Sequence, residues 1–234
     1  MANKRKRMKL DGYSLVELAV VLVIVGILVG GVLKGQDLLE NARLKSVLQQ
    51  VNEIRVAVST FMVKYDALPG DFDQAKNYID AALKNGGGNG IIDGPGLAND
   101  ASGENHETLS FWQHLSASHL LSSPGEVKGN IATFGHGAPS SKIGGGFTVR
   151  HQPYPDMPGH WIVLGKERGG YGDAALLTPA QAMSLDRQAD NGHPSSGKIR
   201  AKEGHGTPPG SCVTREGNYN GSTKEPACVL YFQL

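Results

Sequence analysis

The sequence has 234 residues, enough for one domain of ordinary size or two small ones. Hydrophobic residues make up 39% and the formal net charge is +1, which excludes a wholly disordered chain. With 23 Lys and Arg against 22 Asp and Glu, the composition also excludes a generic basic nucleic-acid binder. Residues 1–84 hold 6 of the 32 glycines, so a regular first third precedes a turn-rich remainder.

The N-terminal segment is basic and is followed by an apolar run. Five cations precede Gly12: Lys4, Arg5, Lys6, Arg7 and Lys9. From Tyr13 to Leu33 the only charged residue is Glu17, and a helix of this length spans about 30 Å, the thickness of a bilayer's hydrocarbon core. No small-residue cleavage site of the secretory type follows the run, which favours an uncleaved anchor. The positive-inside rule predicts a cytoplasmic N-terminus and export of the rest of the chain.

Residues 12–17, GYSLVE, stand directly before the apolar run. They resemble the prepilin leader motif of type IV pilins and type II secretion pseudopilins. In that family a membrane peptidase cuts after the glycine and methylates the new amino terminus. The resemblance implies cleavage between Gly12 and Tyr13, methylation of Tyr13, and Glu17 as the fifth mature residue. The sequence departs from the common pattern in having Tyr where Phe is usual and no proline before Pro69.

Glu17 is an acid at the edge of an apolar span, where an unpaired charge is unfavourable. In the first turn of a helix it is stabilised by the positive end of the helix dipole. In a filament it can pair with the amino terminus of a neighbouring subunit and so set the register. The alternative is an acid that reaches the lipid headgroups and has no further role.

The helix is expected to continue past the apolar run. Residues 36–68 contain neither Gly nor Pro, and apolar residues recur there at helical spacing: Leu44, Val47, Leu48, Val51, Ile54, Val58, Phe61, Met62 and Tyr65. One helix from Tyr13 to about Tyr65 is predicted, and its second half should lie on a globular domain. The predicted organisation has four parts: a leader at 1–12, a membrane or filament-core helix at 13–33, an amphipathic continuation at 34–68 and an extracytoplasmic domain at 69–234.

The remainder predicts short elements separated by loops. Helices are expected at 109–121 and from Pro179 to about Ala189, the second opened by a capping box at Thr178 and Gln181. Strands are expected at 145–152, 160–166, 198–201 and 228–234. Together with the resemblance, these elements predict an α+β, pilin-like fold in which a long N-terminal helix packs on a small antiparallel sheet.

Cys212 and Cys228 are the only cysteines, and both fall in the predicted exported part. An oxidising compartment favours a disulfide between them. The intervening 213–227 segment is polar and glycine-rich, so the bond is expected to hold it in place. It would resemble the disulfide-bounded C-terminal loop of many type IV pilins. The alternatives are a zinc pair with two further ligands and two buried free thiols.

Sites for metals or catalysis are weakly indicated. The loop at 84–94 could bind calcium through Asn89 and Asp93, but a flexible turn is favoured and no cofactor is expected. Asp186 and Asp190 lie on one helix face and are interpreted as surface charges. The sequence contains no GxSxG or HExxH motif, so an enzyme is not expected.

These observations predict a structural subunit of a type IV pilus or a type II secretion pseudopilus, a minor one because the mature chain of 222 residues is long. The expected partners are a prepilin peptidase, other pilin or pseudopilin subunits, an inner-membrane assembly platform and, before assembly, membrane lipid. General nucleic-acid binding is not expected. The expected location is the inner membrane with the C-terminal domain in the periplasm, and then an extracytoplasmic filament. The alternatives are a pilin-like adhesin or DNA-uptake receptor and a membrane-anchored periplasmic hydrolase.

Overall fold

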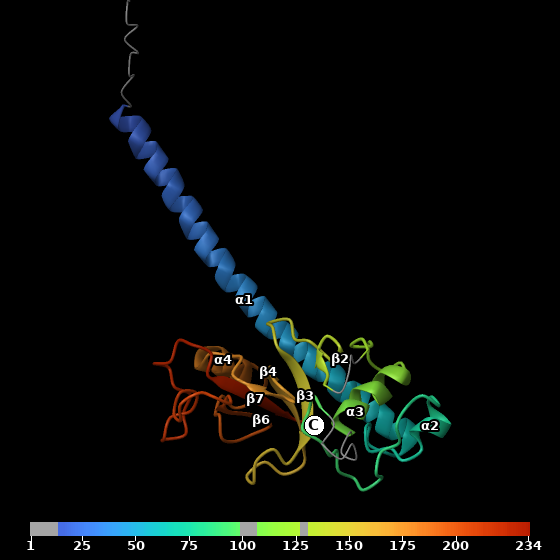
Figure 1. The fold of residues 1–234 in the computed structure, drawn as a ribbon. Helices are drawn as coiled ribbons and strands as arrows, with labels where there is room; N and C mark the ends of the chain where they lie inside the picture. Colours follow the sequence, from blue (N-terminus) through green and yellow to red (C-terminus); the bar gives the residue numbers. More distant parts are fainter. Residues whose placement is uncertain (1–13, 99–106, 127–130) are drawn as a thin grey trace, which may run out of the picture. The chain divides into compact units, whose positions relative to one another are not determined.

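The computed structural model describes residues 14–98, 107–126 and 131–234. The chain divides into two compact units, one ending at Ala42 and the other beginning at Arg43. The longest helix, α1 (Leu15–Tyr65), which is drawn in blue in Figure 1, contributes residues to both units. The predicted long helix is therefore confirmed from Leu15 onwards, whereas Tyr13 lies outside the described residues.

The part of α1 in the first unit is apolar on every face. From Leu18 to Leu33 it carries no charged residue, and the side chains of this stretch are exposed. Within the described ranges, α1 is the one helix long and apolar enough to cross a membrane. A helix that is hydrophobic all round is stable in lipid or among other apolar helices rather than in water.

The part of α1 in the second unit buries a single stripe of side chains. The buried residues recur every three or four positions: Leu44, Val47, Val51, Ile54, Val58 and Phe61. This is the amphipathic pattern that the sequence predicts. Met62, which the spacing assigned to the same stripe, is exposed, because neighbouring residues point about 100° apart around a helix.

The stripe shares a hydrophobic core with one face of an antiparallel sheet. The strand order is β3 (Gly146–His151), β4 (His160–Arg168), β7 (Cys228–Gln233) and β6 (Ile199–Glu203), and β5 (Tyr171–Ala174) pairs with β4. All these pairs are antiparallel. The Arg55 guanidinium donates two hydrogen bonds to the Gln233 carbonyl, at 3.0 and 2.6 Å, and so joins α1 to the last strand. The α+β fold with a long helix on an antiparallel sheet is thereby confirmed.

The four predicted strands correspond to β3, β4, β6 and β7, with ends that differ by one or two residues. The helix predicted from Pro179 to about Ala189 is confirmed as α4 (Pro179–Ala189). The other elements described are α2 (Ala75–Tyr78), α3 (Glu107–Ala117), β1 (Thr133–Phe134) and β2 (Gly137–Ala138). The prediction of a helix to residue 121 was wrong for α3, because the chain turns at His119, whose φ is 59°. The capping box of α4 is present: Thr178 Oγ1 accepts from the Gln181 amide, and the Gln181 side chain accepts from the Thr178 amide.

Candidate assembly site and disulfide loop

Ser14 and Glu17 cap the start of α1. The Ser14 amide donates to Glu17 Oε2 at 3.0 Å, and the Glu17 amide donates to Ser14 Oγ at 3.2 Å. This reciprocal pair is a capping box, and it satisfies two amides that the start of a helix otherwise leaves without an intrahelical partner. The Glu17 carboxylate therefore lies at the positive end of the helix dipole.

The Glu17 side chain is exposed, so a group from another molecule can reach it. Gly12 and Tyr13, the predicted cleavage and methylation positions, lie outside the described residues. The sequence analysis did not identify Ser14, although the spacing Ser-x-x-Glu before an apolar run is itself the signature of a capping box.

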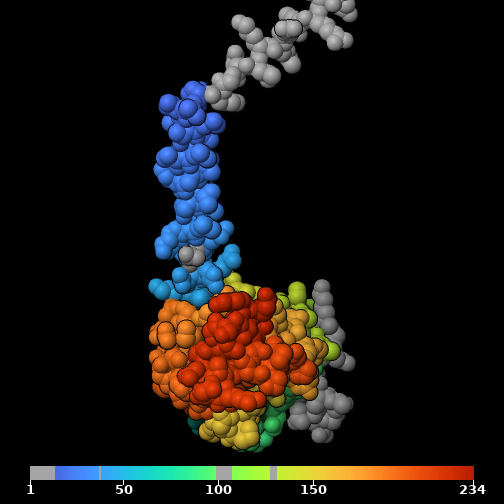
Figure 2. Space-filling model, turned by 90° about the vertical axis from the view of Figure 1, so that its left-hand side faces the viewer, coloured from blue at the N-terminus to red at the C-terminus, as the bar shows by residue number. Residues whose placement is uncertain are grey.

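Cys212 and Cys228 form a disulfide, with their Cα atoms 5.0 Å apart. Both cysteines are fully buried, and Cys228 is the first residue of β7. The bond therefore connects the 213–227 loop to a strand in the middle of the sheet. In Figure 2 the residues near the C-terminus, in red, form much of the face turned to the viewer.

The loop between the cysteines is held by more than the disulfide, which corrects the expectation drawn from its polar composition. Tyr219 is partly buried against the hydrophobic core, and its hydroxyl donates to Asp186 Oδ2 at 2.8 Å. The Asn220 amide donates to the Cys212 carbonyl at 2.9 Å. An aromatic anchor within the loop thus supplies a contact that overall composition does not reveal.

The interpretation of Asp186 and Asp190 as surface charges was wrong. Asp186 is fully buried and also accepts from the Gly192 amide at 3.0 Å. Asp190 is partly buried and accepts from the Ile199 amide at 2.8 Å. Burial raises the pKa of Asp186, and burial together with the contact to Asp186 raises the pKa of Tyr219. Both acids therefore organise the backbone that follows α4.

The glycine-rich loop at 84–94 encloses two buried carboxylates from other parts of the chain. Asp71 and Glu107 each accept two backbone hydrogen bonds at 2.6–3.0 Å, from the amides of Gly87, Asn89, Gly90 and Asp93. Burial is the main cause that raises the pKa of Glu107. The loop is thus closed by contacts between carboxylates and amides.

The candidate calcium ligands take part in this closure. The Asn89 side chain accepts from the Ile91 amide at 2.8 Å, and the Asp93 amide donates to Glu107. Over residues 14–98, 107–126 and 131–234, no group of three or more His, Cys, Asp or Glu side chains is placed to hold a metal ion.

Two buried or half-buried histidines contact backbone groups, which is typical of a structural role. His114 Nδ1 accepts from the Gly70 amide at 3.0 Å, and its Nε2 lies 2.8 Å from the Lys84 carbonyl oxygen. His160 Nε2 accepts from the Ile92 amide at 3.2 Å. Burial, with a smaller effect of His151, lowers the pKa of His160.

Residues 7–33 match the family model described as the prokaryotic N-terminal methylation motif. The match confirms that the chain carries the signature of type IV pilins and pseudopilins, and it indicates a pilin-like protein that a prepilin peptidase processes. It also implies assembly with other pilin subunits. Comparison with curated proteins and with solved structures found no match.

Proposed function

We propose that the protein is a structural, non-catalytic subunit of a type IV pilus or a type II secretion pseudopilus. The observation that carries the proposal is the methylation motif at residues 7–33, which continues into an apolar helix with Glu17 near its start. Cleavage after Gly12 frees an ammonium group at Tyr13, and a peptidase that also methylates this group completes the mature subunit.

Assembly through α1 follows from the chemistry of its first half. Residues 18–33 offer only apolar surface, so they leave lipid only for another apolar environment, such as a bundle of like helices. In such a bundle Glu17 needs a positive partner, because a buried carboxylate left alone is strongly unfavourable. The amino terminus of a neighbouring subunit is a partner that each added subunit supplies.

The location and partners follow from the same segment. The N-terminal cations lie on the cytoplasmic side, the domain after α1 lies in the periplasm, and an inner-membrane assembly platform extracts the subunit. The sequence supplies 222 residues from Tyr13 onwards, a length that favours a minor subunit. Quantitative mass spectrometry of purified filaments measures the amount of this subunit relative to the others. An amount near that of the most abundant subunit would exclude a minor role.

Processing is tested with the native protein and a Gly12→Glu variant. The intact mass of the wild-type protein should correspond to a chain that begins at methylated Tyr13. The variant should keep the full precursor mass, because a bulky acid does not fit where the peptidase accepts glycine. A wild-type mature end beyond Leu33 would contradict the proposal.

A further inference from the structure

The connection between β3 and β4 folds back over one face of the sheet. This is the face that does not share the main hydrophobic core with α1. This segment, residues 152–159, is called the cover below. Beneath it lies a second, smaller hydrophobic cluster of five fully buried residues: Met157 from the cover itself and Trp161, Val163, Val229 and Tyr231 from β4 and β7. Arg200 and Lys202 flank the cluster, because they stand beside Tyr231 and Val229 in the register of β6 with β7.

Side-chain contacts hold the cover to the sheet. Its backbone–backbone hydrogen bonds, from Gln152 to Gly159 and from Met157 to Tyr154, run within the cover. Three of its eight residues are prolines, which have no amide hydrogen to donate. The ladder bonds of the sheet therefore do not depend on the cover.

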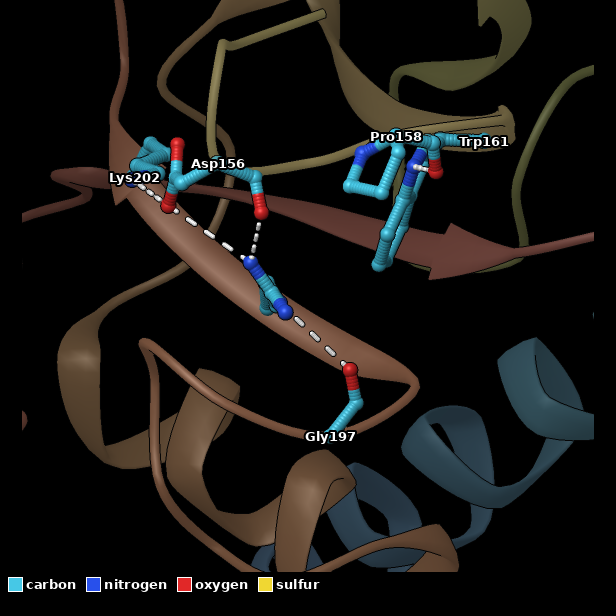
Figure 3. A network of polar contacts seen from close by, with 6 residues as sticks. Asp156, Pro158, Trp161, Gly197 and Lys202 are labelled. Carbon is cyan, nitrogen blue, oxygen red and sulfur yellow. Dashed lines mark hydrogen bonds and ion pairs between the residues drawn. The ribbon is translucent and has the colours of Figure 1, made fainter. Parts of the chain in front are cut away.

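Asp156 makes the charged contacts between the cover and the sheet. Its Oδ2 lies 3.0 Å from Lys202 Nζ and 3.5 Å from an Arg200 nitrogen, and Arg200 also donates to the Asp156 carbonyl. Figure 3 shows Asp156 and Lys202 joined in this network, together with the bond from Trp161 Nε1 to the Pro158 carbonyl at 2.9 Å. Half of the Asp156 side chain is exposed, so water and salt reach the ion pair.

We propose that the cover opens as a unit while the sheet stays folded, and that the Asp156 carboxylate is the latch that holds it shut. Local opening is expected where few backbone bonds tie a segment to the fold. Opening uncovers an aromatic and aliphatic surface beside two cations. The proposal concerns the second unit alone and does not depend on filament assembly.

Oxidation of methionine by dilute peroxide, followed by peptide mass spectrometry, measures the opening in the full-length protein. Met157 is fully buried under the cover, whereas Met62 on α1 is exposed and serves as the internal reference. In Asp156→Asn the oxidation rate of Met157 relative to Met62 should rise by roughly fivefold, the effect of losing an exposed ion-pair contact. Amide exchange in β4 and β7 should stay at the wild-type level.

Lys202→Leu removes the shorter of the two ion pairs of Asp156 from the other side, together with the contact of the Lys202 ammonium with the Tyr154 ring, and leaves Arg200 in place. It should also raise the oxidation rate of Met157, which keeps the proposal testable even if Asp156→Asn folds poorly. Asp173→Asn is the matched control, because it breaks the Arg168–Asp173 ion pair, which does not involve the cover. It should leave the oxidation rate of Met157 unchanged. An unchanged rate in both latch variants would overturn the proposal. So would a rise that occurs only together with faster amide exchange in β4 and β7, because the sheet itself would then be opening.

Discussion

At the scale of single residues, Glu107 and Asp186 have raised pKa values because burial disfavours their charged form. Asp186 illustrates the consequence. It is fully buried, yet it accepts hydrogen bonds from Tyr219 and from the Gly192 amide, which partly offset the loss of hydration. Its folded state therefore binds a proton more tightly than its unfolded state does.

This linkage predicts the pH dependence of stability. The stabilisation by the Asp186 proton is complete below the unfolded pKa of about 3.9 and is lost as pH rises through the higher folded pKa. Asp186→Asn does not titrate and keeps an oxygen acceptor, so its stability should improve relative to wild type from about pH 4 to pH 7. Denaturant unfolding at several pH values, with exposed Asp73→Asn as control, measures the difference. The prediction would be contradicted if the difference in free energy of unfolding between the variant and wild type stayed constant with pH. It would also be contradicted if wild type became the more stable of the two as pH rises.

At the scale of elements, the disulfide and the Tyr219–Asp186 contact both hold the disulfide loop, in addition to backbone hydrogen bonds at its ends. Replacing both cysteines by serine should lower the free energy of unfolding by about 3 kcal/mol, the value expected for a closed loop of this size. The loop should nevertheless stay docked through Tyr219 and Asp186. Trypsin, which can cut at Arg215 and Lys224 within the loop, tests this point.

Cleavage of the loop should accelerate strongly only when Tyr219→Phe, which costs about 1 kcal/mol by itself, is added to the serine pair. Tyr219→Phe with the disulfide intact is the control and should be cut slowly. Rapid cleavage of the serine pair alone would show that the Tyr219–Asp186 contact does not keep the loop docked.

The glycine-rich loop at 84–94 depends on a close approach of backbone segments at Gly86. A Cβ at Gly86 would collide with the Gly70 carbonyl oxygen and with the backbone of Asp71, so the chain must shift to accept it. Gly86→Ala should therefore destabilise the fold by about 1–3 kcal/mol, whereas Gly221→Ala, in open space, should change little. Thermal unfolding measures the stability of both variants. Equal effects of the two substitutions would contradict a close approach at Gly86.

Because backbone amides already satisfy Asp71 and Glu107, the melting temperature of wild type is expected to be the same in calcium and in a chelator. A calcium-dependent rise that Asp93→Asn abolishes would instead support the loop as a cation site.

At the scale of the whole molecule, the capping role of Glu17 and its proposed role in assembly can be separated by one substitution. Gln at this position can still close the capping box with Ser14, but it carries no charge. Glu17→Gln should insert in the membrane and be cleaved like wild type, yet it should enter filaments poorly, because it cannot pair with a neighbouring ammonium. Glu17→Ala loses both the charge and the cap. Immunoblots that compare sheared filaments with the membrane fraction measure how much of each variant enters filaments. Incorporation of the Gln variant at the wild-type level would show that the charge has no part in assembly.

The sequence by itself determined the long helix, its division into an apolar and a one-sided half, the family resemblance and four of the strands. These features depend on local periodicity, on charge and on a short motif, all of which are visible along the chain. Only the tertiary structure decided that Asp186 is buried, that Tyr219 anchors the disulfide loop, and that the cover closes over Trp161 and Tyr231. Asp186 with Tyr219, and the cover with Tyr231, are residues far apart in sequence, and such pairing leaves no periodic signal. From the sequence alone, a polar residue in a loop or on a helix face is assigned to the surface. Only the fold shows that it is buried against a hydrogen-bonding partner.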